Sequence, residues 1–236
     1  MRTDRAMQRA RLWRVVALAT ALVATAFWIG QSSGASRFDR AAPTKPLSSL
    51  GHLKPAPLPA HLGPELVPIP VGPLLAAPAS RATLTKSIDG IKCQPQEKVL
   101  FHIHAHLTVF VNGKARLIPY GIGIGPPLRG QTTKAGAFVS QGTCFSWLHT
   151  HVADGIIHIE SPLQKTYTLG EFFDIWGQPL SGNQVGPARG TVTAIVNGSV
   201  YVGDPRQIPL LKHAQIQLEV GTPLIAPVSI KFHGPL

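Results

Sequence analysis

The chain lacks the signatures of several common enzyme classes. It carries no nucleophile triad motif, no glycine-rich phosphate loop and no paired-carboxylate motif, so those chemistries are not indicated. Methionine occurs only at Met1 and Met7, and cysteine only at Cys93 and Cys144. Sulfur ligands are therefore scarce, and histidine, with ten residues, is the metal-ligating residue type that stands out.

Acidic residues are also few, 11 against 22 Lys and Arg, which gives a formal net charge of +11. Ten of the basic residues precede position 86, and the remainder of the chain has 12 basic and 8 acidic residues, scattered singly. Since there is no basic stripe with interleaved aromatic residues, we expect no nucleic-acid binding.

Residues 1–37 have the pattern of an N-terminal signal peptide or signal anchor. Five arginines and one acid in residues 1–14 precede an apolar run over 15–30. The run is slightly long for a signal peptide and short for a membrane span of about 20 residues, so both cleavage and retention as a membrane anchor remain open. In either case the rest of the chain is predicted to be exported, and to be membrane-tethered if the segment is retained.

Residues 38–85 hold ten of the 22 prolines. Such alternating proline favours an extended polyproline II spacer that cannot pack a core. We therefore predict a Pro-rich linker over 38–85, followed by a single domain over 86–236, which is long enough to bury a hydrophobic core.

Six histidines fall in two short patches with strand periodicity. In F-H-I-H-A-H-L, at 101–107, the residues His102, His104 and His106 alternate with apolar residues and share one face of a strand. One face of this strand is predicted to be core and the other to present ligands.

The second patch is L-H-T-H-V-A-D-G-I-I-H-I-E at 148–160. Asp154-Gly155 is a dipeptide preferred in two-residue type I′ turns, which predicts a hairpin with His151 opposite His158 and His149 opposite Glu160. All four polar side chains then share a face. A loop one residue longer would place them on different faces.

Clustered imidazoles with a nearby carboxylate favour a Zn(II) or Cu(II) site, formed by His102, His104, His106, His149, His151, His158 and Glu160. Glu160 could be a ligand, a hydrogen-bond acceptor for a ligand, or a general base. The simpler interpretation is a polar sheet face or hydrogen-bonded core imidazoles.

Both cysteines lie shortly before a histidine patch. Export to an oxidising compartment favours a Cys93–Cys144 disulfide, which would close a loop of about 50 residues. The alternative is that Cys144 is a thiolate ligand of copper, although no methionine is available for such a site.

The fold class predicted for this domain is α+β and β-rich, with several antiparallel hairpins and one short helix. Asn112-Gly113 and Asn197-Gly198 predict two hairpin turns, and late strands are expected near 213–220 and 228–232. Thr168 and Glu171 form a capping box for a helix over 169–176. The order of elements over about 147–221 resembles a β-grasp, and a β-sandwich is the alternative.

Three motifs together resemble a group of uncharacterised prokaryotic proteins that are exported or membrane-anchored. They are H-I-H-A-H-L-T-V-F-V-N-G, L-H-T-H-V-A-D-G-I-I-H-I-E-S-P and T-L-G-E-F-F-D-I-W-G. The resemblance covers roughly 100–221 and implies an extracytoplasmic location, but no activity.

The sequence thus supports two hypotheses on function. The first is an extracytoplasmic, membrane-tethered protein that binds Zn(II) or Cu(II) on a histidine-lined sheet face. The alternative is a metal-dependent hydrolase, lyase or oxidase in which Glu160 acts as general base or acid.

Overall fold

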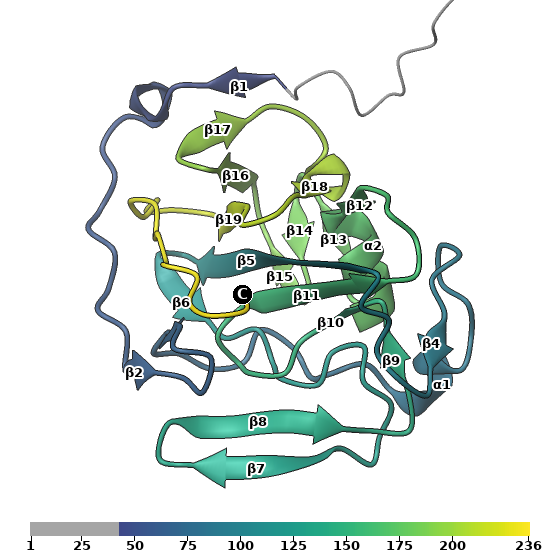
Figure 1. Cartoon of the computed structure of the whole chain (residues 1–236). Helices are drawn as coiled ribbons and strands as arrows, with labels where there is room; N and C mark the ends of the chain where they lie inside the picture. Colours follow the sequence, from purple (N-terminus) through teal and green to yellow (C-terminus); the bar gives the residue numbers. More distant parts are fainter. Residues whose placement is uncertain (1–42) are drawn as a thin grey trace, which may run out of the picture. The chain divides into compact units, whose positions relative to one another are not determined.

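The computed structural model describes residues 43–236, which Figure 1 shows as a β-rich fold with an α-helix against its main sheet. The predicted signal or anchor at 1–37 and the first residues of the predicted linker lie outside this described part. No helix within it is long and apolar enough to cross a membrane.

The strands are β1 (Thr44–Lys45), β2 (His61–Leu62), β3 (Pro68–Ile69), β4 (Cys93–Gln94), β5 (Phe101–Val111), β6 (Lys114–Arg116), β7 (Arg129–Thr133), β8 (Gly136–Gln141), β9 (Phe145–Ser146), β10 (Leu148–His149), β11 (Ile156–Ser161), β12 (Tyr167–Thr168), β13 (Leu180–Ser181), β14 (Gln184–Val185), β15 (Ala188–Arg189), β16 (Val192–Val196), β17 (Ser199–Tyr201), β18 (Pro209–Leu210) and β19 (Gln215–Val220). The helices are α1 (Arg81–Leu84) and α2 (Leu169–Trp176), with 3-10 turns η1 (Leu47–Leu50) and η2 (Pro205–Gln207).

The main sheet has eight strands in the order β1-β17-β16-β19-β5-β11-β10, with β6 also on β5. The long strand β5 pairs in parallel with β19 along one edge. Its other edge pairs antiparallel with β11 in its first half and with β6 in its second half. The strand that carries three of the histidines is therefore held on both sides.

The two faces of β5 differ as the alternation predicts. Ala105, Leu107 and Val109 are buried in the main core, which also contains Phe172 and Trp176 of α2. The even-numbered residues face the opposite side, where His104 and His106 are buried as well. One face of the sheet thus packs against the helix, and the other presents imidazoles.

Helix α2 spans the predicted residues and has the predicted ends. The Thr168 side chain accepts from the Glu171 N–H, and the Glu171 carboxylate accepts from the Thr168 N–H, which completes the capping box. Gly177 ends the helix with the left-handed φ of 69° that favours glycine at this position. The prediction of this helix is confirmed.

The strand-rich α+β class and the two Asn-Gly hairpins are also confirmed. Val111 pairs with Lys114 and Val196 with Ser199, and all four turn residues between them have positive φ, as type I′ turns require. The order β6-β5-β19-β16-β17, with β5 parallel to β19 and α2 on one face, is β-grasp-like. Its first hairpin is β5–β6, however, rather than the predicted hairpin at 148–160.

The Pro-rich segment is extended but is not a free spacer, and the prediction that it packs no core is wrong for its described part. Val67, Leu75 and Leu84 are each at most 5% exposed. The Trp176 indole N–H also donates to the Ala77 carbonyl at 2.7 Å. Isolated apolar residues between the prolines pack against the rest of the domain, which proline content alone does not reveal.

The predicted strand at 228–232 is absent, since this stretch forms no ladder in the described structure. The side chains of β19 hold it instead. Gln217 accepts from the Val228 N–H at 2.8 Å, and Gln215 accepts from the Ile230 N–H at 2.7 Å. Side-chain amides on this face replace the backbone partners that a neighbouring strand would supply, so residues 225–230 cover the sheet without joining it.

The carboxyl group of Glu219, which contacts this covering segment, makes the stability of the fold depend on pH. Burial raises the pKa of Glu219 to about 7, although its carboxylate accepts from Gln217 and from the Ile225 N–H. Between the ordinary Glu pKa of about 4.3 and pH 7 the folded protein holds a proton that the unfolded chain releases, so this group lowers the free energy of unfolding as pH rises.

We predict that Glu219→Gln removes this contribution, because a neutral amide keeps the acceptor oxygen and does not ionise. The melting temperature of the variant minus that of the wild type should increase from pH 5 to pH 8. At pH 5 both side chains are neutral, which provides the internal control. Parallel melting curves across this range would contradict the assignment.

Candidate metal centre

Strand β5 supplies the first group of predicted ligands. His102, His104 and His106 lie on the face opposite the core, as predicted from the alternation. His104 is 3% exposed, whereas the His102 side chain is 35% exposed. The centre therefore reaches from the buried middle of the sheet to solvent at His102.

The second patch forms a hairpin, but its register differs from the prediction. His149 pairs with His158, and six residues separate β10 from β11, where a two-residue turn was expected. The Asp154 carboxylate accepts from the Ile156 N–H at 3.0 Å, so this residue closes an Asx-type turn at the end of a longer loop. The predicted pairs of His151 with His158 and of His149 with Glu160 are wrong.

The predicted shared face nevertheless holds, because the register differs by two residues and preserves the side-chain parity. Strand β11 also pairs with β5, where His158 lies opposite His104 and Glu160 opposite His102. One row across three strands is therefore His104, His158 and His149.

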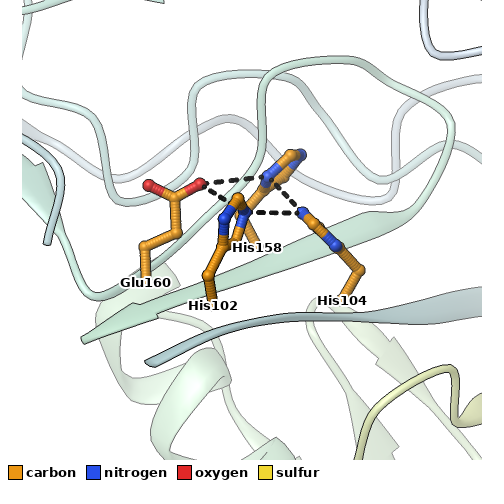
Figure 2. A group of neighbouring side chains, drawn as sticks. All are labelled: His102, His104, His158 and Glu160. Atoms are coloured by element: carbon orange, nitrogen blue, oxygen red, sulfur yellow. Dashed lines mark hydrogen bonds and ion pairs between the residues drawn. The ribbon is translucent and has the colours of Figure 1, made fainter. Parts of the chain in front are cut away.

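The first candidate ligand set is His102, His104, His158 and Glu160, drawn in Figure 2. His104 Nε2 lies 3.1 Å from both His102 Nε2 and His158 Nδ1. Glu160 Oε1 lies 3.2 Å from His102 Nε2 and 3.5 Å from His158 Nδ1. A tetrahedral site with metal–ligand bonds of about 2.0–2.1 Å has ligand atoms about 3.3 Å apart, so these four separations are close to those expected around a single ion.

A second set combines His149 and His151 with the same His158 and Glu160. His149 donates Nδ1–H to the Ser146 carbonyl at 2.9 Å, and His151 donates Nδ1–H to the Val139 carbonyl of β8. Because carbonyl oxygens only accept, these bonds place the ring protons on Nδ1. The two Nε2 atoms, 3.1 Å apart, then direct their lone pairs at each other.

His106, also predicted as a ligand, is not brought into either set. Its Nε2 donates to the Asp154 carbonyl at 3.0 Å, and its Nδ1 is buried without a partner. Burial lowers the pKa of His106 to about 4, so the ring is neutral. In the structure it holds the β10–β11 loop against β5.

Two further carboxylates, which the sequence patterns missed, belong to the centre. Glu65, from the Pro-rich segment, accepts from His158 Nε2 at 2.9 Å, and its side chain is 7% exposed. Glu97 Oε1 lies 3.6 Å from His151 Nε2 and 4.0 Å from His149 Nε2. The one available signal for Glu65 is that it is the only acid between positions 40 and 88.

For several of the imidazoles, burial disfavours the charged form more than the nearby groups favour it. Burial, followed by the neighbouring His158, lowers the pKa of His104 to about 3. The pKa values of His149 and His151 are also lowered, in both cases chiefly by burial. These rings are therefore neutral and able to ligate a metal ion.

His158 is the exception. Burial disfavours its charged form, yet hydrogen bonds with Glu160 and Glu65 raise the pKa of His158 to about 9. For Glu160, burial acts to raise the pKa, but the hydrogen bond from His158 lowers it overall. Two buried carboxylates thus favour a positive charge at this position, whether a proton or a metal ion provides it.

Some of the oxygen atoms of these carboxylates have no hydrogen-bond partner. Glu65 Oε2 and Glu160 Oε2 are buried and have no hydrogen-bond partner. Unpartnered buried carboxylate oxygens are costly, and an ion is one of the recognised ways to satisfy them.

A cavity of about 350 Å³ adjoins the first ligand set. Its lining residues are Pro64, Glu65, Leu66, His102, His104, Phe138, His151, His158, Glu160 and His233–Leu236. The Pro-rich segment, β8 and the C-terminal residues thus form the walls over the histidine face. A small molecule in this cavity would lie beside His102 and His104.

The disulfide between Cys93 and Cys144 is present, and the described residues include no free cysteine. Cys144 is therefore not a thiolate ligand. The bridge joins β4 to the residue before β9, and these strands also pair, Cys93 with Ser146. It thus holds both the Ser146 carbonyl, which orients His149, and the start of the segment that carries Glu97.

We predict that Cys93→Ser/Cys144→Ser loses about 4 kcal/mol of unfolding free energy, because a loop of 51 residues is no longer closed in the unfolded chain. Affinity for Zn(II) should fall with it, while the ligands remain nitrogen and oxygen. Denaturant unfolding and calorimetric titration measure the two effects. An unchanged affinity would show that the bridge does not position the ligands.

No protein-family model, curated protein or solved structure matches this chain significantly. The resemblance to exported proteins with the same motifs therefore stays a prediction. What the chain does has to be inferred from the chemistry of the centre itself.

Proposed function

We propose that this protein binds a divalent transition-metal ion, Zn(II) or Cu(II), at the histidine face of its sheet, on the extracytoplasmic side of a membrane. The observation that carries the proposal is the pair of Nε2 atoms of His149 and His151, 3.1 Å apart with both Nδ1 protons donated elsewhere.

The alternative, a set of hydrogen-bonded core imidazoles, does not account for this pair. A hydrogen bond between the two Nε2 atoms needs a proton on one of them, which would make that ring a cation. Burial opposes this, since it lowers the pKa of both rings. A metal ion accepts lone pairs from both nitrogens at once and needs no such proton.

The environment of His158 supports the same proposal. Metal-ligating histidines commonly donate their other ring N–H to a carboxylate, which fixes the tautomer and raises the basicity of the ligating nitrogen. Glu65 accepts from His158 Nε2 at 2.9 Å, which leaves Nδ1 facing His104 and Glu160.

The donor set favours Zn(II) and Cu(II) over other ions. It consists of imidazole nitrogens and carboxylate oxygens, and the sulfur of both cysteines is used in the disulfide. A nitrogen-rich shell suits Zn(II), while Cu(II) has the highest affinity for imidazole among first-row divalent ions.

The extracytoplasmic location rests on two observations. The disulfide is typical of proteins in an oxidising compartment. The arginine-rich and apolar pattern of residues 1–37 favours export, with a membrane tether if that segment is retained.

Metal-dependent catalysis is a second candidate function, and the observation in its favour is the cavity beside the first ligand set. Glu160 suits the role of a ligand better than that of general base, because Oε1 already contacts His102 and His158. Any proton acceptor in such a reaction would have to come from the cavity wall, where Glu65 lies.

We predict that the purified full-length chain binds Zn(II), and that His104→Ala/His158→Ala lowers the affinity of the first ligand set by more than about 100-fold, because two of its four ligands are removed. Calorimetric titration and metal analysis after dialysis measure this. The matched control is His52→Ala, which removes an exposed histidine outside the centre and should leave binding unchanged.

Circular dichroism of the metal-free proteins establishes that the double variant is folded. Zn(II) binding by the folded double variant with the same stoichiometry and affinity as the wild type would contradict the proposal, as would a wild type that binds no Zn(II) or Cu(II).

A further inference from the structure

We propose that the centre holds two metal ions rather than one, with Glu160 shared between them. This inference rests on the proposed function and specifies its site. The first ion would be held by the first candidate set, His102, His104, His158 and Glu160. The second would be held by His149, His151, Glu160 and Glu97, with Glu97 in place of the His158 of the second candidate set, because His158 serves the first ion.

The number of donors is the first argument. Eight side chains converge on the centre: His102, His104, His149, His151, His158, Glu65, Glu97 and Glu160. A protein-bound Zn(II) takes four ligands, so a single ion would leave four of these eight groups outside its coordination shell. With two ions, seven side chains are ligands and Glu65 orients His158.

The second argument is that the donors separate into two groups. His102 and His104 come from β5, on one side of β11, whereas His149 comes from β10, on its other side. The Nε2 atoms of His149 and His151 face each other at 3.1 Å, and Glu97 Oε1 lies 3.6 Å and 4.0 Å from them. The separations of 3.1 Å and 3.6 Å are near the roughly 3.3 Å expected around one tetrahedral ion, whereas that of 4.0 Å is longer.

Glu160 is the group that can connect the two positions. Its carboxylate belongs to both candidate ligand sets, and within each set the donor atoms lie within 4.8 Å of one another. A carboxylate can serve two ions, and its Oε2 is buried without a hydrogen-bond partner. Ions that share a carboxylate in this way are typically about 3.5–4 Å apart.

The charge of the centre is consistent with two ions. The ion pairs of Glu65, Glu97 and Glu160 are all with histidines. Three ionised carboxylates carry a charge of −3, which becomes −1 with one divalent ion and +1 with two, so the charge of the centre is compatible with a second ion.

The decisive experiment is native mass spectrometry of the full-length chain after Zn(II) loading and dialysis. We expect two Zn(II) per chain in the wild type and in the His52→Ala control. His102→Ala/His104→Ala should retain one, held by His149, His151, Glu97 and Glu160. Glu97→Gln/His151→Ala should also retain one, held by the first set.

Loading the wild type with two equivalents of Cu(II) provides a test that needs no variant. Two ions bridged by Glu160 should show spin–spin coupling in the electron paramagnetic resonance spectrum, with a half-field transition. Two uncoupled Cu(II) signals would overturn the shared position of Glu160.

One Zn(II) per wild-type chain would overturn the second site and leave the proposed function intact. No bound Zn(II) or Cu(II) would overturn both.

Discussion

The alternation of side chains along β5 is the constraint on which the rest of the structure depends. One face of this strand carries Ala105, Leu107 and Val109 into the core against α2. The same period of two places the even-numbered histidines on the other face. Pairing with β11 then adds His158 and Glu160 opposite His104 and His102. Core and centre are thus two faces of one strand, so a change of register would disrupt both.

Burial of the aligned histidines determines what they can bind. The Nε2 atoms of His149 and His151 lie 3.1 Å apart, and both rings donate their Nδ1 protons to backbone carbonyls. The two Nε2 lone pairs can therefore be satisfied together only by a cation. The cover over this face comes from segments with little secondary structure. The Pro-rich segment brings Glu65, and residues 225–230 are held by Gln215 and Gln217. The Pro-rich segment and the C-terminal residues 233–236 line the cavity at the edge of the centre.

The sequence predicted the features that depend on local periodicity and turn chemistry. Neighbouring residues are enough to predict the capping box of α2, both Asn-Gly turns and the common face of the histidines. The disulfide follows because only two cysteines are available to form it. It did not predict the length of the loop before β11, because Asp154 uses its side chain in an Asx-type turn instead of entering a type I′ turn. Nor did it predict the contributions of Glu65 and Glu97, because their positions depend on tertiary docking that no local pattern encodes.

X-ray absorption at the Zn edge of the Zn(II)-loaded full-length chain tests the central claim most directly. We predict a first shell of nitrogen and oxygen at about 2.0–2.1 Å, with the outer-shell scattering of imidazole rings and no sulfur. A sulfur shell near about 2.3 Å, or a shell of oxygen atoms without imidazole scattering, would contradict a metal centre built on the histidine face.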